Sequence, residues 1–169
     1  MATDTTTRFA SALETAGVEC TRTETDGFES ALADAVEGTA VGAPLGIDGV
    51  SLDGTAVTTP PTPRLLQEAD TGVTRVGGGV AEHGSFLIQS DAAGTEPVSL
   101  YPRKHVGVVR ASDVHDTLDD ALTWLGSEFR AGRDSAIVAT GVSATADMGE
   151  LVEGVHGPQA VHALVLTDR

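Results

Sequence analysis

Residues 106–140, VGVVRASDVHDTLDDALTWLGSEFRAGRDSAIVAT, decide the expected fold because they hold a strand, a helix and a second strand in succession. The apolar run at residues 106–109 is typical of a buried strand. A helix is predicted between residues 113 and 130, ended by Gly132, from an apolar stripe formed by Leu118, Ala121, Leu122, Leu125 and Phe129. Residues 135–140 have the pattern of the next strand. Strands that alternate with helices favour a largely parallel sheet covered on both faces.

The same alternation continues toward both ends of the chain. Helices are expected at residues 4–16 and 28–36, and Pro63 fits the first turn of a further helix. Strands are expected at residues 18–23, 39–42, 73–80, 85–89 and 160–167. No internal repeat or composition shift divides the 169 residues. We therefore expect one α/β domain over residues 1–169, with a mostly parallel sheet flanked by helices.

The charge balance is strongly acidic, with a formal net charge of −15, nine arginines and a single lysine, Lys104. Such a surface stays hydrated in concentrated salt, where a Debye length of about 3 Å at 1 M screens its self-repulsion. We expect a halophilic, cytoplasmic protein, and an ordinary acidic protein is the alternative. With no basic stripe, no signal peptide and no apolar run of about 18 to 20 residues, neither nucleic-acid binding nor membrane insertion is expected.

The single cysteine, Cys20, excludes an intrachain disulfide and an iron–sulfur cluster held by this chain alone. The sequence also lacks the GxGxxG fingerprint of dinucleotide-binding proteins and the GxxxxGK[ST] spacing of a P-loop. We therefore expect no cofactor in this chain.

The most informative chemistry lies at residues 140–158, between the last two expected strands. Gly141, Ser143, Thr145 and Asp147 follow a strand directly, where hydroxyls and the free N–H groups of a following helix start could hold a carboxylate or phosphate. The alternative is structural: Ser143 or Thr145 caps that helix, and Asp147 interacts with its dipole.

Farther along, His156 and Gly157 lie in a tight turn just before the last strand. His156 could complete a divalent-metal site with Asp147 and Glu150, since two carboxylates and an imidazole suit zinc, manganese or iron. No HExxH-like spacing supports a metal, and a hydrogen-bonded structural histidine is the simpler interpretation.

Two further segments carry candidate side chains. Glu82, next to the glycine-lined turn at Gly84, suits a nucleophile or general base, or it simply caps a turn on an acidic surface. Arg103, Lys104 and His105 form a local basic cluster that could orient an anionic substrate or pair with surplus carboxylates.

Three ordered motifs resemble the LUD domain family. Residues 140–166, TGVSATADMGELVEGVHGPQAVHALVL, are similar to the family's T-G-P-S-x-T-A-D-I-E followed by G-V-H-G-P and an apolar strand. Residues 81–85, AEHGS, resemble its A-E-T-G-T, and residues 99–109, SLYPRKHVGVV, resemble its S-L-L-P-x-x-H-I-x-V-V. Val142 stands where the family usually has proline, and Gly149 interrupts the expected Ile-Glu pair before Glu150, so the loop geometry is expected to differ.

The resemblance implies a fold similar to ribose-5-phosphate isomerase, glucosamine-6-phosphate deaminase and CoA transferases. It also implies a role in oxidising L-lactate to pyruvate together with iron–sulfur partner subunits. Since this chain cannot carry the electrons itself, the expectation is a non-redox subunit whose loops at residues 140–147 and 154–158 bind a small carboxylate or contact a partner. Two alternatives stay open: an enzyme of the CoA-transferase type with Glu82 as nucleophile, because its Glu-x-Gly element is similar, and a module that binds an organic acid.

Overall fold

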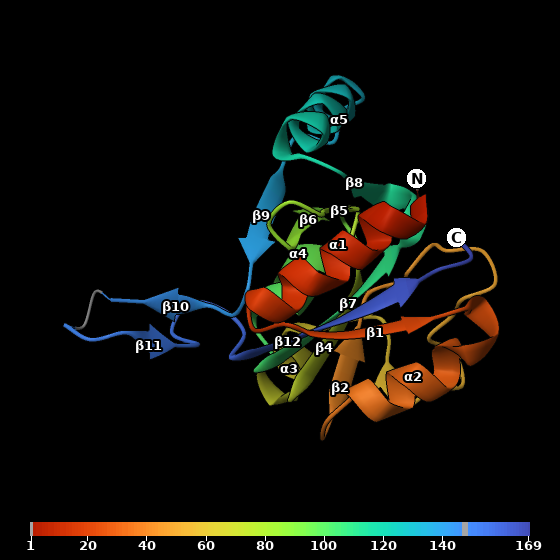
Figure 1. Ribbon diagram of the computed structural model, residues 1–169. Coiled ribbons are helices and arrows are strands. Elements are labelled where there is room, and N and C mark those ends of the chain that lie inside the picture. Colours follow the sequence, from red (N-terminus) through yellow and green to blue (C-terminus); the bar gives the residue numbers. More distant parts are fainter. Residues whose placement is uncertain (1, 147–148) are drawn as a thin grey trace.

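Helices and strands alternate along the computed structural model, which describes residues 2–146 and 149–169 (Figure 1). Its helices are α1 (Ala2–Thr15), α2 (Phe28–Ala35), α3 (Pro63–Glu68), α4 (Thr95–Leu100) and α5 (Leu118–Arg130), with 3₁₀ turns at Thr25–Gly27 and Ala111–Asp113. Two of the starts follow standard capping chemistry: the Thr62 hydroxyl accepts from the Leu65 N–H ahead of Pro63, and the Thr117 hydroxyl accepts from the Asp120 N–H. No described helix is both long and apolar enough to cross a membrane.

The larger sheet has six strands, all parallel, in the order β1-β12-β7-β4-β2-β3. Their bounds are β1 (Glu19–Thr23), β12 (Ala160–Leu166), β7 (Lys104–Arg110), β4 (Thr71–Arg75), β2 (Ala40–Gly42) and β3 (Val57–Thr58). This sheet confirms the α/β prediction of a parallel sheet with helices.

A second, four-stranded sheet has the order β8-β5-β6-β9. It contains β8 (Val114–His115), β5 (Gly78–Val80), β6 (Ser85–Gln89) and β9 (Ala136–Thr140), and β6 is antiparallel to both of its neighbours. Two sequence expectations are corrected here. Residues 73–80 do not form one strand but divide between β4 and β5, and β9 does not continue the parallel sheet after the strand–helix unit at 106–130.

Glycines allow the second sheet to pack closely on its neighbours. A Cβ atom on Gly77 would lie 2.7 Å from the Gln89 side-chain oxygen, and one on Gly79 would lie 2.8 Å from the Phe9 ring. Since real Cβ atoms do not approach so closely, a larger residue at either position would push these side chains away. The glycine run therefore brings Phe9 of α1 and Gln89 of β6 against the backbone that joins the two sheets.

The alternation of apolar residues along β12 separates two core layers. Leu164 and Leu166 pack with Phe28 and Leu32 of α2 on one face of the parallel sheet. Val161, Ala163 and Val165 pack on the other face, in a cluster that also holds Phe9 and Leu13 of α1, Phe86 of β6 and Val109 of β7. Helix α5 covers the small sheet through Ala121 and Leu125, which pack against Val80 and Leu87. The layers are thus α2, the parallel sheet, α1 with the small sheet, and α5.

A short hairpin of β10 (Ala144–Thr145) and β11 (Val152–Glu153) extends away from these layers (Figure 1). The sequence predicted a helix start after residue 140, and that prediction is wrong. The chain turns at Gly141, whose φ of 73° suits glycine, and then enters the hairpin. The Ser143 N–H donates to Pro158 O (3.0 Å) and the Gly154 N–H to Ser143 O (2.8 Å), so the backbone is paired across the hairpin base rather than wound into a helix.

Candidate functional site

Six of the residues selected from the sequence lie around one cavity of about 180 Å³, which we call the motif cavity: Gly84, His105, Gly141, Ser143, His156 and Gly157. The ends of β6 and β9, the start of β7 and the base of the hairpin bring them together. The rest of the lining is mostly apolar, including Leu13, Phe86 and Val161. The three family-like motifs, separated in the sequence, therefore meet in space at this cavity.

His105 is a deeply buried polar residue of the motif cavity, with a relative exposure of 2%. Its Nε2 lies 2.8 Å from the Thr74 hydroxyl, and its ring meets the Phe86 ring edge-on with centroids 6.0 Å apart. Desolvation lowers the pKa of His105 to about 4. A neutral imidazole can orient a ligand by hydrogen bonding, but it supplies no positive charge for an anion.

The other hairpin residues lie apart from this cavity. Glu150 is exposed on the hairpin, Thr145 belongs to β10, and Asp147 lies outside the described residues. Within the described ranges, no group of three His, Cys, Asp or Glu side chains is placed to hold a metal ion. The expected anion site at a helix start has no helix to form it, because the segment is a hairpin.

Arg103 and Glu82 also lie outside the motif cavity. The Arg103 guanidinium donates to Gln159 Oε1 through Nη2 (3.1 Å), beside the buried Lys104, which pairs with Glu37. The Glu82 carboxylate accepts from the Leu118 N–H (3.1 Å) at the first turn of α5. An anionic side chain there stabilises the helix N-terminus, a structural role for Glu82.

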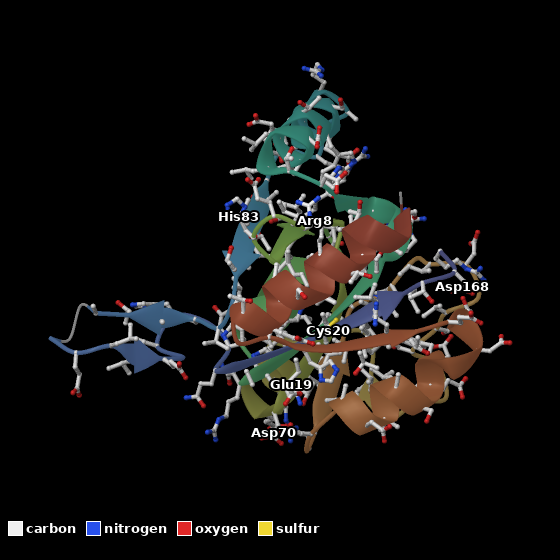
Figure 2. All side chains as sticks on the ribbon, in the orientation of Figure 1. Arg8, Glu19, Cys20, Asp70, His83 and Asp168 are labelled. Atoms are coloured by element: carbon white, nitrogen blue, oxygen red, sulfur yellow. The ribbon has the colours of Figure 1, made fainter. Side chains whose placement is uncertain are left out.

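The acidic side chains labelled in Figure 2 come from different segments of the chain: Glu19 from β1, Asp70 from the bend before β4, and Asp168 from the turn after β12. Cys20, in β1, is half-buried, and its burial raises the pKa of the thiol. Because a thiolate is the reactive form, Cys20 is a poor nucleophile at neutral pH.

A larger cleft of about 630 Å³ opens at the carboxyl ends of β2, β4 and β7. Ligands of open α/β sheets bind at this edge, where the loops that follow parallel strands converge. The cleft was not predicted from the sequence. Arg75 lies inside the strand predicted at residues 73–80, Arg110 directly follows the apolar run at 106–109, and Arg133 lies two residues before the strand predicted at 135–140, so none of them differs from any other solvated cation. These three residues line what we call the arginine cleft.

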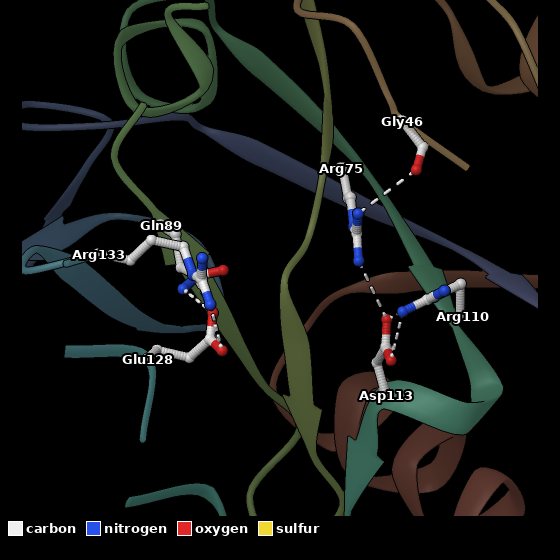
Figure 3. A network of polar contacts seen from close by, with 7 residues as sticks. All are labelled: Gly46, Arg75, Gln89, Arg110, Asp113, Glu128 and Arg133. Atoms are coloured by element: carbon white, nitrogen blue, oxygen red, sulfur yellow. Dashed lines mark hydrogen bonds and ion pairs between the residues drawn. The ribbon is translucent and has the colours of Figure 1, made fainter. Parts of the chain in front are cut away.

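Two of the three arginines each donate two hydrogen bonds to a carboxylate (Figure 3). Arg110 donates to Asp113 through Nε (2.7 Å) and Nη2 (2.9 Å). Arg133 likewise donates to Glu128 through Nε and Nη2, and the Gln89 amide donates to Glu128 Oε2 (2.8 Å). The hydrogen bonds from Arg133 and then Gln89 lower the pKa of Glu128 to about 2, so this carboxylate stays ionised.

Arg75, between these two pairs, has donors that the protein does not satisfy (Figure 3). Its Nη1 reaches Gly46 O only at 3.5 Å, and its Nη2 lies 3.6 Å from Asp113 Oδ2, beyond hydrogen-bond distance. Its Nε is buried and has no hydrogen-bond partner among the residues that the structure describes. Because Nε is inaccessible, an anion would bind the Nη1 and Nη2 edge of the Arg75 side chain, which is 33% exposed.

An aromatic pair also lines the arginine cleft. His115 and Trp124 line the cleft with ring centroids 5.4 Å apart, and desolvation lowers the pKa of His115. Trp124 is the only tryptophan in the sequence, so the intrinsic tryptophan fluorescence of the protein reports on this cleft.

Comparisons with known proteins agree with this architecture. A solved DUF162 family protein from Deinococcus radiodurans superposes with a TM-score of 0.76 over 99% of both chains, at 22% identity, which shows the fold. Lactate utilization protein C of the same organism is 33% identical over 104 residues, covering 60% of this chain and 48% of that protein. Lactate utilization protein C of a Geobacillus species is 29% identical over 107 residues, which cover 61% of this chain and 44% of that protein.

The chain thus spans about half the length of the curated relatives it matches. The family model for the LUD domain matches residues 58–166, which include β4 to β12, and with them the whole four-stranded sheet, strands β4, β7 and β12 of the parallel sheet, and all three motifs. The chain belongs to the LUD domain family.

Proposed function

We propose that this chain is a non-redox component of a lactate-utilization system and that it binds a small carboxylate. Its family and the names of its relatives support a role in lactate utilization. Its single, half-buried cysteine supports the non-redox part, because this chain has too few thiolates to hold an iron–sulfur cluster. Iron–sulfur partner subunits would then carry the electrons.

The observation that carries the carboxylate proposal is the unsatisfied guanidinium of Arg75 in the arginine cleft. Arg110 and Arg133 each donate two hydrogen bonds to a carboxylate of the protein, which compensates their charge. Arg75 has only two long contacts and a buried Nε without a partner. A planar carboxylate matches the geometry of a free guanidinium edge.

Isothermal titration calorimetry with L-lactate tests this site, using Arg75→Gln against Arg64→Gln. Arg64 is the matched control because its side chain is 83% exposed and pairs only with Glu68, four residues along α3. We expect Arg75→Gln to weaken lactate binding by at least about tenfold, the loss of one charge-assisted hydrogen bond, and Arg64→Gln to leave it unchanged. Equal binding by both variants and the parent would refute the placement at Arg75.

With the carboxylate ligand at Arg75, the motif cavity and the hairpin are available for contacts with partner subunits. Leu151 and Val155 in the hairpin segment are 73% and 42% exposed, and a two-stranded hairpin by itself is only marginally stable in water. A pulldown in concentrated KCl should recover iron–sulfur subunits with the intact chain, and less with a variant carrying Leu151→Ser. Recovery of no iron–sulfur protein would count against the partner proposal.

The alternative of a CoA-transferase-type enzyme requires a reactive Glu82. Incubation with acyl-CoA compounds followed by mass spectrometry would reveal a thioester at that residue. Because Glu82 is bonded to the Leu118 N–H and lines neither the cavity nor the arginine cleft, we expect none.

A further inference from the structure

The surroundings of Arg75 favour one kind of carboxylate over another. Two polar atoms that its guanidinium contacts, Gly46 O and Asp113 Oδ2, are both hydrogen-bond acceptors. A carboxylate that approaches Arg75 therefore meets the negative oxygen of Asp113 within the same few ångströms. Arg110 reduces this repulsion, because it donates two hydrogen bonds to Asp113 and compensates part of its negative charge.

A ligand that also carries a hydroxyl group can turn this repulsion into a hydrogen bond. Each Asp113 oxygen accepts one hydrogen bond from Arg110, and a carboxylate has about four lone-pair positions, so acceptor capacity remains. Asp113 Oδ2 lies 3.6 Å from Arg75 Nη2, close enough for neighbouring groups of one small molecule to contact both. A hydroxyl on the carbon next to the ligand carboxylate would then have an acceptor within reach, Asp113.

We propose that the arginine cleft selects 2-hydroxy acids over 2-oxo acids, with the ligand carboxylate on Arg75 and its 2-hydroxyl donating to Asp113. The proposal rests on the carboxylate site proposed above and specifies the class of ligand. A 2-oxo acid presents only a carbonyl oxygen at that position. It cannot donate, and it would set an acceptor against the acceptors Asp113 and Gly46 O. Lactate is thus retained, and pyruvate, which lacks the donated hydrogen, is released.

The expected discrimination follows from the single hydrogen bond to a charged acceptor that the 2-oxo acid cannot make. Such bonds correspond to about a 10- to 100-fold change in affinity. Propionate has the carboxylate but no oxygen at the second carbon. It should bind more weakly than lactate and no more weakly than pyruvate, because it adds no acceptor to the acidic side of the cleft.

The experiment measures dissociation constants of the full chain for L-lactate, pyruvate and propionate by calorimetry, with Trp124 fluorescence as the report from the cleft. Asp113→Asn is the test variant and Asp53→Asn the control, because Asp53 is an exposed loop residue outside the cleft lining. We expect the parent and Asp53→Asn to bind lactate at least about tenfold more tightly than pyruvate. Asp113→Asn, whose amide can donate to a carbonyl, should lose most of that preference.

The parent chain alone already tests the selectivity, so the result does not depend on how well Asp113→Asn folds. Equal affinity for lactate and pyruvate, with both lost in Arg75→Gln, would overturn the selectivity and leave the carboxylate site in place. Lactate selectivity that Arg75→Gln does not affect would instead refute the site itself. Failure of the parent to bind any of the three acids would overturn both proposals.

Discussion

His105 provides the sharpest prediction about stability. It is 2% exposed, hydrogen-bonded to Thr74 and packed edge-on against Phe86, and its pKa is lowered from 6.5 to about 4 because burial desolvates the imidazolium. Lowering the pH from 7 to 4 should therefore destabilise the parent chain more than a His105→Gln variant, whose side chain does not titrate.

The sign and size follow from proton linkage. Above pH 6.5 the imidazole is neutral in both the folded and the unfolded chain, and His105 adds no pH dependence. Between pH 6.5 and about 4 only the unfolded chain takes up the proton, so the free energy of unfolding falls as the pH falls. At about 1.4 kcal/mol for each pH unit, the loss over this window is about 3 kcal/mol, and it levels off below pH 4.

Urea unfolding at fixed KCl and at several pH values measures this loss. Carboxylates with lowered pKa, such as Glu128, also cost stability toward acid, but they do so equally in each variant and cancel in the difference. His83→Gln is the control, because the His83 side chain is 49% exposed. If the parent and His105→Gln lose the same free energy between pH 6.5 and 4, the imidazole is not buried as the structure shows.

Three further changes test the fold and its surface. The midpoint of thermal unfolding should rise with KCl concentration, because salt screens the net charge of −15, and equal stability in dilute buffer would contradict a halophilic protein. Gly79→Ala should cost about 1–3 kcal/mol of unfolding free energy, since its Cβ would lie 2.8 Å from the buried Phe9 ring, and an unchanged urea midpoint would contradict that packing. Gly126→Ala in α5 should instead raise the free energy of unfolding by roughly 0.5–1 kcal/mol, because the nearest atom to its Cβ is the flexible end of an arginine side chain at 3.9 Å. Thermal unfolding followed by circular dichroism measures this change, and a lower midpoint than that of the parent would contradict it.

The helices and strands that could be predicted are those whose own residues repeat at the helical or strand period. The helix stripe through Phe28 and Leu32 and the apolar strand at 106–109 were predicted, and the parallel sheet followed from their alternation. The division into two sheets was not, because it depends on contacts distant in sequence, such as Gly79 with Phe9. Helix α4 was missed because its six residues are too few for a helical period and include Pro97.

The motifs located a cavity, but they did not locate the arginine cleft. Residues such as Gly84, His105 and Gly157 were chosen from three separate segments, and the structure brings them together. Arg75 carried no local signal, since an arginine at a strand end resembles any solvated cation. Its unsatisfied donors become visible only when Gly46, Arg110 and Asp113 are placed around it.

Strand β12 has a consequence for how the protein is made. It lies between β1 and β7, and it pairs Glu19 with His162 across a separation of 143 residues. On the ribosome, β1 has no neighbour on this side until residues 160–166 emerge, which at about 5–20 residues per second is roughly ten seconds later. During that interval the nascent chain exposes unpaired strand edges, which promote aggregation. Acidic residues are spread along the whole sequence, so unfinished chains repel one another, and this repulsion opposes aggregation until β12 joins the sheet.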